Sequence, residues 1–189
     1  MKSDKIQQFM EIADQSYASR FSTGSDEERA LGAQLLLSEV LEYVVHGLGV
    51  VPLVDGHPVL KPNDIEYRTE YDGKKGEPDK KEMVDGLADV AYTMFWNKVK
   101  FGVPLEEAFE LVCDNNLSKF VELPDWKDGA GPVDREGWGL GKEVRWPESV
   151  VAVEIVKIKE SFFAVGKDSS GKVRKPSTYE SVDLGHLVD

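Results

Sequence analysis

The sequence is poor in the residues that bind soft metals or form disulfides. Its 189 residues include one cysteine, Cys113, and three histidines. A single cysteine excludes an intramolecular disulfide and the usual cysteine-rich zinc cages, and it fits a reducing compartment. His57 and His186 stand in expected loops with no second ligand at metal-binding spacing. Neither histidine therefore indicates a metal site.

Positive charge is also scarce, with 23 Lys and Arg against 35 Asp and Glu and a net charge of −12. We expect no nucleic-acid or membrane partner, because both are bound through basic surfaces. The acidity permits a nucleotide ligand, since divalent cations would invert the local charge. The N-terminus is too polar for a signal peptide, and no apolar run reaches membrane-spanning length. We therefore expect a soluble, cytoplasmic protein with a real core.

Apolar residues recur at helical spacing in the first two thirds of the chain. The predicted helices run from Ser3 to about Ser19, from Ser25 to about His46, from Lys80 to Phe101 and from Pro104 to about Phe120. Ser25 followed by Glu28 is a capping-box pattern, and Gly102 is a C-cap signal. The connector over residues 50–79 is rich in proline and glycine, and long loops of this kind are often functional.

The composition changes near residue 124. Asp125–Pro147 is rich in Gly and Trp, and Val150–Lys159 with Ser161–Gly166 predicts a hairpin that turns near Glu160. A third extended piece is expected at Lys172–Lys175. The predicted fold is mainly α, a four- to five-helix bundle with a C-terminal β-hairpin extension. Residues 1–123 form the expected helical catalytic domain, connector 50–79 included, and residues 124–189 the extension.

Two apolar helices carry carboxylates at regular spacing. Glu39 and Glu42 lie at i, i+3 within LLLSEVLEYVV, and Glu82, Asp85 and Asp89 lie at i, i+3, i+7 in the next acidic helix. Two such faces packed together would make a cage of oxygen ligands suited to Mg²⁺ or Mn²⁺. The alternative is that these are solvated faces of ordinary helices. It fits Glu82, at the polar start of its helix, better than Asp89, whose neighbours in the sequence are apolar.

Two rival motifs fit less well. A di-iron bundle needs Glu-x-x-His on two helices, whereas His46 follows Glu42 by four residues and the third helix has no histidine. Gly166–Val173 has the P-loop spacing, but valine replaces the final Ser or Thr and no helix follows. A hairpin turn is the better interpretation of that stretch.

The order of these segments resembles a known enzyme family. ExxE on one helix, followed by E-x-x-D-x-x-x-D on the next, is similar to the all-α nucleotide pyrophosphohydrolases, the superfamily of MazG, dimeric dUTPases and phosphoribosyl-ATP pyrophosphohydrolase, nearest to bacteriophage forms. The segments that carry the resemblance are Leu35–Glu42 (LLLSEVLE), Glu82–Tyr92 (EMVDGLADVAY), Phe101–Phe109 (FGVPLEEAF), Asn115–Phe120 (NNLSKF) and Gly171–Leu184 (GKVRKPSTYESVDL). Residues 125–167 are covered poorly.

The resemblance implies a homodimer or homotetramer that hydrolyses a nucleoside triphosphate to a monophosphate and pyrophosphate. The implied Mg²⁺ ligands are Glu39, Glu42, Asp85, Asp89 and Glu82, with Glu39 and Glu42 also catalytic. The implied substrate contacts are Asn116, Lys119, Tyr92, Trp96, Lys172 and Lys175. From the residues alone, the alternatives are a solvated helix end for Asn116 and Lys119, core packing for Tyr92 and Trp96, and a solvated strand end for Lys172 and Lys175.

The chain departs from the family pattern at two positions. Ser38 and Gly86 stand where members often have glutamate. These departures favour the alternative of a non-catalytic descendant that binds a nucleotide or second messenger. A hydrolase of an alarmone or of phosphoribosyl-ATP also remains open.

Overall fold

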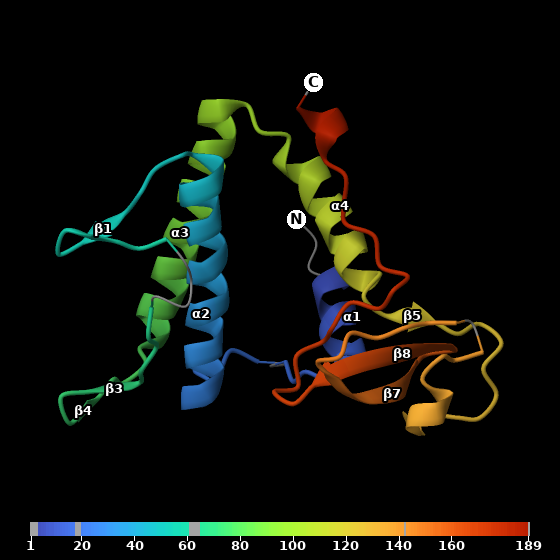
Figure 1. The fold of residues 1–189 in the computed structure, drawn as a ribbon. Coiled ribbons are helices and arrows are strands. Elements are labelled where there is room, and N and C mark those ends of the chain that lie inside the picture. Colours follow the sequence, from blue (N-terminus) through green and yellow to red (C-terminus); the bar gives the residue numbers. More distant parts are fainter. Residues whose placement is uncertain (1–3, 18–19, 61–64, 142, 189) are drawn as a thin grey trace. The chain divides into compact units, whose positions relative to one another are not determined.

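The computed structural model describes residues 4–17, 20–60, 65–141 and 143–188. By its internal contacts the chain divides into two compact units. Residues 19–93 form one unit, and residues 1–18 together with 94–189 form the other. The predicted domain boundary at residue 123 stays a prediction, since contact grouping does not test it. The ribbon in Figure 1 shows the long helices α2 and α3 and the sheet built by β7 and β8.

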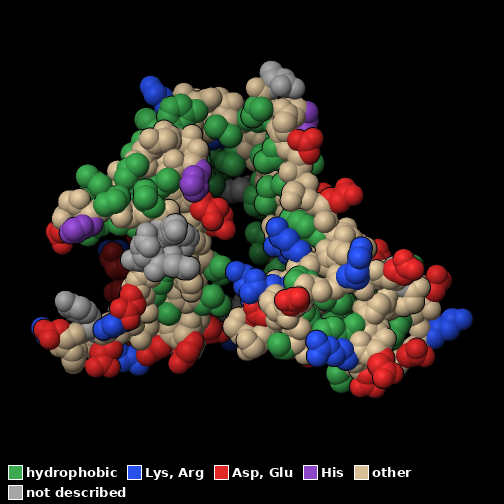
Figure 2. Space-filling view, viewed as in Figure 1, with side chains coloured by type: hydrophobic (Ala, Val, Ile, Leu, Met, Phe, Trp, Pro, Cys, Tyr) green, Lys and Arg blue, Asp and Glu red, His purple; other side chains and the backbone are tan. Residues whose placement is uncertain are grey.

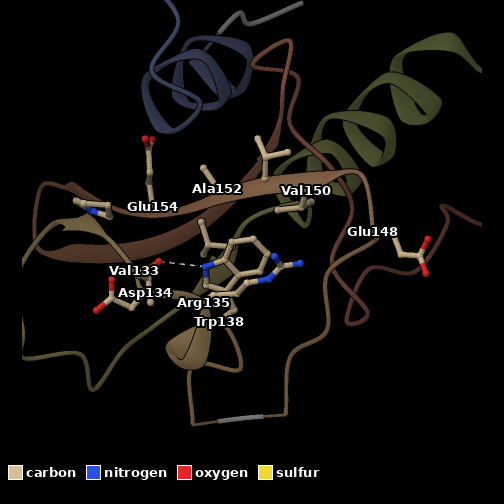
Figure 3. Close-up of a pocket in the computed structure, with 11 residues that line it drawn as sticks. Val133, Asp134, Arg135, Trp138, Glu148, Val150, Ala152 and Glu154 are labelled. Atoms are coloured by element: carbon tan, nitrogen blue, oxygen red, sulfur yellow. Dashed lines mark hydrogen bonds between the residues drawn. The ribbon is translucent and has the colours of Figure 1, made fainter.

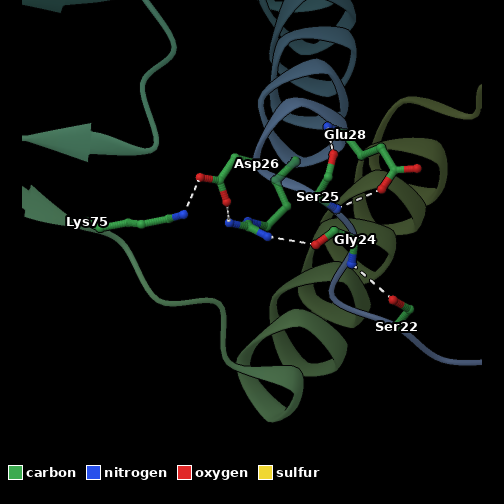
Figure 4. Close-up of polar contacts among 7 residues, drawn as sticks. Ser22, Gly24, Ser25, Asp26, Glu28 and Lys75 are labelled. Atoms are coloured by element: carbon green, nitrogen blue, oxygen red, sulfur yellow. Dashed lines mark hydrogen bonds and ion pairs between the residues drawn. The ribbon is translucent and has the colours of Figure 1, made fainter.

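Helix α2 (Asp26–Glu42) begins at the predicted capping box. The Ser25 hydroxyl accepts a hydrogen bond from the Glu28 N–H at 3.1 Å, and the Glu28 carboxylate accepts one from the Ser25 N–H at 2.7 Å (Figure 4). Both bonds satisfy N–H groups that a helix start otherwise leaves unpaired. Asp26, in the same turn, pairs with Arg29 and with Lys75. At its other end α2 continues as a π-helical turn, η1 (Tyr43–Gly47).

The connector forms two small hairpins. Strand β1 (Leu53–Val54) pairs with β2 (His57–Pro58), and β3 (Glu70–Tyr71) pairs with β4 (Lys74–Lys75). Each turn is an Asp-Gly pair with positive φ at both residues: Asp55 and Gly56 at 50° and 80°, Asp72 and Gly73 at 53° and 68°. Asp-Gly is a preferred sequence for such turns. Residues 53–58 and 70–75 of the connector therefore form regular turns that the overall proline and glycine content does not reveal.

Helix α3 (Lys80–Phe101) has the predicted bounds. Gly102, at φ +67°, follows its last residue and takes the left-handed conformation that ends a helix. Helix α4 (Leu105–Leu117) follows Pro104, close to the predicted start. The first helix, α1 (Asp4–Ile12), is shorter than predicted, and the predicted limits Ser3 and Ser19 lie outside the described residues.

The sheet is antiparallel, with the strand order β5-β8-β7-β6. Its centre is the predicted hairpin of β7 (Val150–Ile158) and β8 (Ser161–Asp168). The hairpin turns at Lys159 and Glu160, and a single bridge from Lys167 to Val173 extends it. The short strands β5 (Val121–Glu122) and β6 (Gly131–Pro132) flank the hairpin, β5 against β8 and β6 against β7.

Both faces of this sheet take part in cores. Ile12 and Ala13 at the end of α1, Phe120 after α4 and Val165 of β8 form one buried cluster. The second cluster includes Val153, Ile155 and Ala164, and partly buried tryptophans of the Gly- and Trp-rich segment pack against it. These tryptophans are Trp126, Trp138 and Trp146. The segment therefore covers the sheet.

The prediction of a mainly α bundle with a hairpin extension is wrong: the described chain is an α+β fold. The hairpin is the middle of a four-stranded sheet, and α1 and the end of α4 pack onto it. The prediction failed because β5 and β6 have two residues each, and partners more than twenty residues away define them as strands. Among the described residues no helix combines the length and apolarity needed to cross a bilayer.

Candidate functional site

The carboxylates of α2 and α3 are exposed. Glu39 and Glu42 lie on the last turn of α2, directly before the π-helical turn η1. Glu82, Asp85 and Asp89 lie along α3 at the predicted spacing, and all three are exposed. Helical geometry therefore places each set on one helix face, as the sequence predicts.

Within the described chain, none of these five carboxylates has an ion-pair or side-chain hydrogen-bond partner. Other acidic side chains of the protein do have such partners. Asp26 pairs with two cations, Glu106 pairs with Lys98, and Asp79 caps α3 by accepting hydrogen bonds from backbone N–H groups at 2.7 and 3.1 Å. The capping by Asp79 is a local signal that the sequence analysis missed.

The structure does not gather the five carboxylates into one site. Across residues 4–17, 20–60, 65–141 and 143–188, no group of three or more His, Cys, Asp or Glu side chains is arranged to hold a metal ion. The donor chemistry still suits Mg²⁺, because all five are carboxylates and hard cations take oxygen ligands. The metal site stays a prediction.

Two aromatic residues of α3, Tyr92 and Trp96, are not core residues. Tyr92 is 70% exposed and Trp96 is 52% exposed. Exposed aromatic rings on one helix suit stacking on a planar ligand or contact with another protein surface. The alternative that these rings pack in the core is not what the structure shows.

Asn116 and Lys119 lie together at the end of α4. The Lys119 ammonium donates a hydrogen bond to the Asn116 side-chain oxygen at 2.5 Å, and it lies 5.7 Å from the centroid of the Phe9 ring. Both side chains are half-buried. The predicted pair therefore exists as a unit, with a cation and an amide on one face of the last turn.

Lys172 and Lys175 are exposed residues of the C-terminal tail. The Lys175 ammonium lies 4.4 Å from the centroid of the Tyr179 ring, a cation–π contact. Lys172 contributes its backbone N–H to the turn that follows β8. Its side chain projects from the stretch with P-loop spacing.

That stretch is a closed turn around Asp168. One oxygen of the buried Asp168 carboxylate accepts hydrogen bonds from the Ser170 N–H (2.9 Å), the Ser170 hydroxyl (2.7 Å) and the Lys172 N–H (3.0 Å). The other accepts from Arg174 Nε at 2.8 Å. The Ser170 hydroxyl, the backbone N–H groups and Arg174 together hold the pKa of Asp168 far below its usual range. A P-loop offers its N–H groups to phosphate, whereas here Asp168 occupies two of them.

A hollow of about 440 Å³ lies beside the sheet (Figure 3). Its wall is the Trp138 ring, whose N–H donates to the Val133 carbonyl at 3.0 Å, with the Arg135 guanidinium 5.4 Å from the ring centroid. Residues of β7 form its floor, and one of them, Glu154, pairs with Lys167 at 2.9 Å. None of the predicted site residues lines this hollow.

Comparisons of this chain with protein-family models, with curated proteins and with solved structures find no match. The resemblance to the all-α nucleotide pyrophosphohydrolases therefore rests on the motifs in the sequence and stays a prediction.

Proposed function

We propose that the protein is a Mg²⁺-dependent nucleotide pyrophosphohydrolase of the cytoplasm. Its reaction would convert a (d)NTP and water to a (d)NMP and pyrophosphate. The observation that carries the proposal is the pair of carboxylate stripes on α2 and α3, which are exposed and have no cationic partner among the residues described. Exposed carboxylates without a cationic partner are available to coordinate a hard cation such as Mg²⁺.

Each carboxylate would have a defined part. Glu39, Glu42, Asp85 and Asp89 would hold Mg²⁺ (or Mn²⁺), with Glu82 at the start of α3 as a further ligand. When bound, the metal would neutralise phosphate charge and make a bound water more acidic. Glu39 or Glu42 would accept the proton of the attacking water. The water oxygen would bond to phosphorus at the α–β bridge as the bridging P–O bond breaks and pyrophosphate leaves.

The remaining predicted residues would bind the substrate. Lys119 and Asn116 offer a cation and an amide to phosphate or ribose, and Lys172 and Lys175 add two exposed cations. Tyr92 and Trp96 expose rings on which a base can stack. Nothing in these contacts selects one base.

A second candidate function is non-catalytic binding of a nucleotide or second messenger. The observation that favours it is that the described carboxylates do not converge on one point. Gly86 also favours it, because glycine stands there where members of the resembled family often have a glutamate. This candidate predicts tight binding of one nucleotide and no turnover of any.

We also propose that a second copy of the chain covers the apolar faces of α2 and α3. Large apolar residues on these helices are exposed: Leu31, Leu35, Leu36, Leu37, Val40, Met83, Val84 and Leu87. Figure 2 shows more hydrophobic side chains at the surface over the β1–β2 hairpin, where Leu53 and Val54 are both more than 60% exposed. Stable dimers bury about 800 Å² per partner, and large exposed apolar patches commonly mark surfaces that another protein covers.

The experiment is a turnover panel. The protein is incubated with Mg²⁺ and each NTP and dNTP, an alarmone and phosphoribosyl-ATP, and the release of pyrophosphate and orthophosphate is measured. We expect pyrophosphate with at least one nucleotide, and a loss of at least 100-fold in Glu39→Gln and Asp89→Asn. Glu27→Gln is the matched control, because Glu27 lies on α2 outside the stripe. Tight binding of one nucleotide without turnover of any would instead establish the non-catalytic candidate.

A further inference from the structure

The C-terminal tail is tied to two other parts of its own unit. The Ser177 N–H donates to the Arg145 carbonyl at 2.8 Å, and the Arg145 N–H donates to the Ser177 hydroxyl at 3.0 Å. Pro176, one residue earlier, is buried. The tail is therefore fixed on the segment before β7, and from there residues 177–180 reach α4.

The contact with α4 uses both ends of one amide side chain. The Asn115 Nδ2 group donates to the Glu180 carbonyl at 2.6 Å, and the Tyr179 hydroxyl donates to Asn115 Oδ1. The Glu180 carbonyl only accepts hydrogen bonds, so it fixes which end of the amide faces it. With the amide held that way, the Asn115 oxygen faces the Tyr179 hydroxyl. Asn115 and Tyr179 are both half-buried, which strengthens such bonds relative to bonds in water.

This contact lies beside the proposed substrate pair. Asn116 is the next residue of α4, so its side chain points about 100° away from that of Asn115 around the helix. It shares a face with Lys119, to which it is hydrogen-bonded at 2.5 Å. The Tyr179 ring that holds Asn115 also carries the Lys175 ammonium on its face. One tail residue thus orients both the last turn of α4 and a cation of the tail.

We propose that Tyr179 and Asn115 are positioning residues: they hold the end of α4 so that Asn116, Lys119 and Lys175 bind the phosphates of one ligand. This inference rests on the proposed function for the identity of the substrate. It adds a role for two residues that touch no ligand themselves. The ligand class it requires is a polyphosphate anion, since the groups that the contact would position are two ammonium groups and an amide.

The test compares Tyr179→Phe with Tyr17→Phe. Tyr179→Phe removes one hydroxyl and keeps the ring under Lys175. Tyr17→Phe removes a hydroxyl of the same unit that donates to Glu11 at 2.7 Å, far from this contact along the chain. For a nucleotide that is turned over, we expect KM to rise about five-fold in Tyr179→Phe, the effect of one hydrogen bond, with kcat within two-fold. Tyr17→Phe should match the wild type.

A binding measurement keeps this inference separate from the proposed hydrolysis. Calorimetry with inorganic tripolyphosphate should show about five-fold weaker binding in Tyr179→Phe. The double variant with Asn115→Ala should lose less than the sum of the two single effects, because both changes remove the Tyr179–Asn115 hydrogen bond. Circular dichroism confirms that each variant is folded. If the wild type binds tripolyphosphate but hydrolyses nothing, only the proposed enzyme fails. Equal binding by wild type and folded Tyr179→Phe, or no binding by the wild type, would overturn the positioning role.

Discussion

Gly166 on β8 sits against the Trp146 ring, and replacing it with alanine should destabilise the sheet. A Cβ atom at this position would lie 2.3 Å from Trp146 Cε3 and 2.5 Å from Cζ3. Carbon atoms pack at about 3.5–4.0 Å, so the ring or the strand must move by more than 1 Å. The ring is held by its N–H, which donates to the Trp138 carbonyl at 3.1 Å.

The expected loss of stability is about 2–3 kcal/mol, because overpacking costs about 1–3 kcal/mol and displacing the ring strains a hydrogen bond worth about 1 kcal/mol. Urea unfolding at 25 °C, followed by tryptophan fluorescence, measures it. With a slope of about 2 kcal/mol per molar urea, the midpoint should fall by about 1–1.5 M in Gly166→Ala.

The matched control is Gly86→Ala on α3. Nothing lies within 4 Å of a Cβ at Gly86, so alanine there should stabilise the helix by about 0.5–1 kcal/mol. In the background of Gly166→Ala, Trp146→Phe should destabilise less than it does alone, since it removes part of the clashing ring. A Gly166→Ala protein with a wild-type urea midpoint would refute this account of the sheet.

The turn at Asp168 and the assembly of the protein give two further predictions. The folded pKa of Asp168 is lowered, so its contribution to stability is present above its unfolded pKa of about 3.9 and is lost as the pH falls toward the folded value. The urea midpoint of Asp168→Asn should therefore differ most from the wild type at pH 7 and approach it toward pH 2, whereas a constant difference would contradict the ionic role. Light scattering after gel filtration should show that the wild type is a homodimer or homotetramer. The double variant Leu35→Lys/Leu87→Lys should dissociate it, whereas the control Val188→Lys should not. A monomeric wild type at micromolar concentration would rule out the proposed assembly.

Local signals predicted much of the helical part of the fold. The capping box at Ser25 and the glycine after Phe101 fix helix ends through contacts within one helical turn. Because all the residues involved are neighbours in the sequence, the local sequence is enough to predict these helix ends. The β7–β8 hairpin was predictable for the same reason, since its two long strands are adjacent in sequence. The Asp-Gly turns at residues 55–56 and 72–73 are local signals that were present and overlooked.

The sheet was not predictable because its outer strands are defined by distant partners. Val121 pairs with Ala164, and Gly131 pairs with Ile155. Two-residue strands show no alternation that a sequence pattern can reveal. The carboxylates follow the same rule. The spacing of Glu39 and Glu42 on one helix was predictable, whereas a metal site shared with Asp85 and Asp89 would depend on packing between helices, which a local sequence pattern does not contain.

The central claim is that the carboxylates of α2 and α3 support hydrolysis between the α and β phosphates of a nucleotide. The most direct measurement is the product released by wild type and Asp89→Asn in the presence of Mg²⁺. Our account predicts pyrophosphate and nucleoside monophosphate from the wild type, and a loss of at least 100-fold in folded Asp89→Asn. Orthophosphate as the only product, or equal turnover by Asp89→Asn, would contradict it.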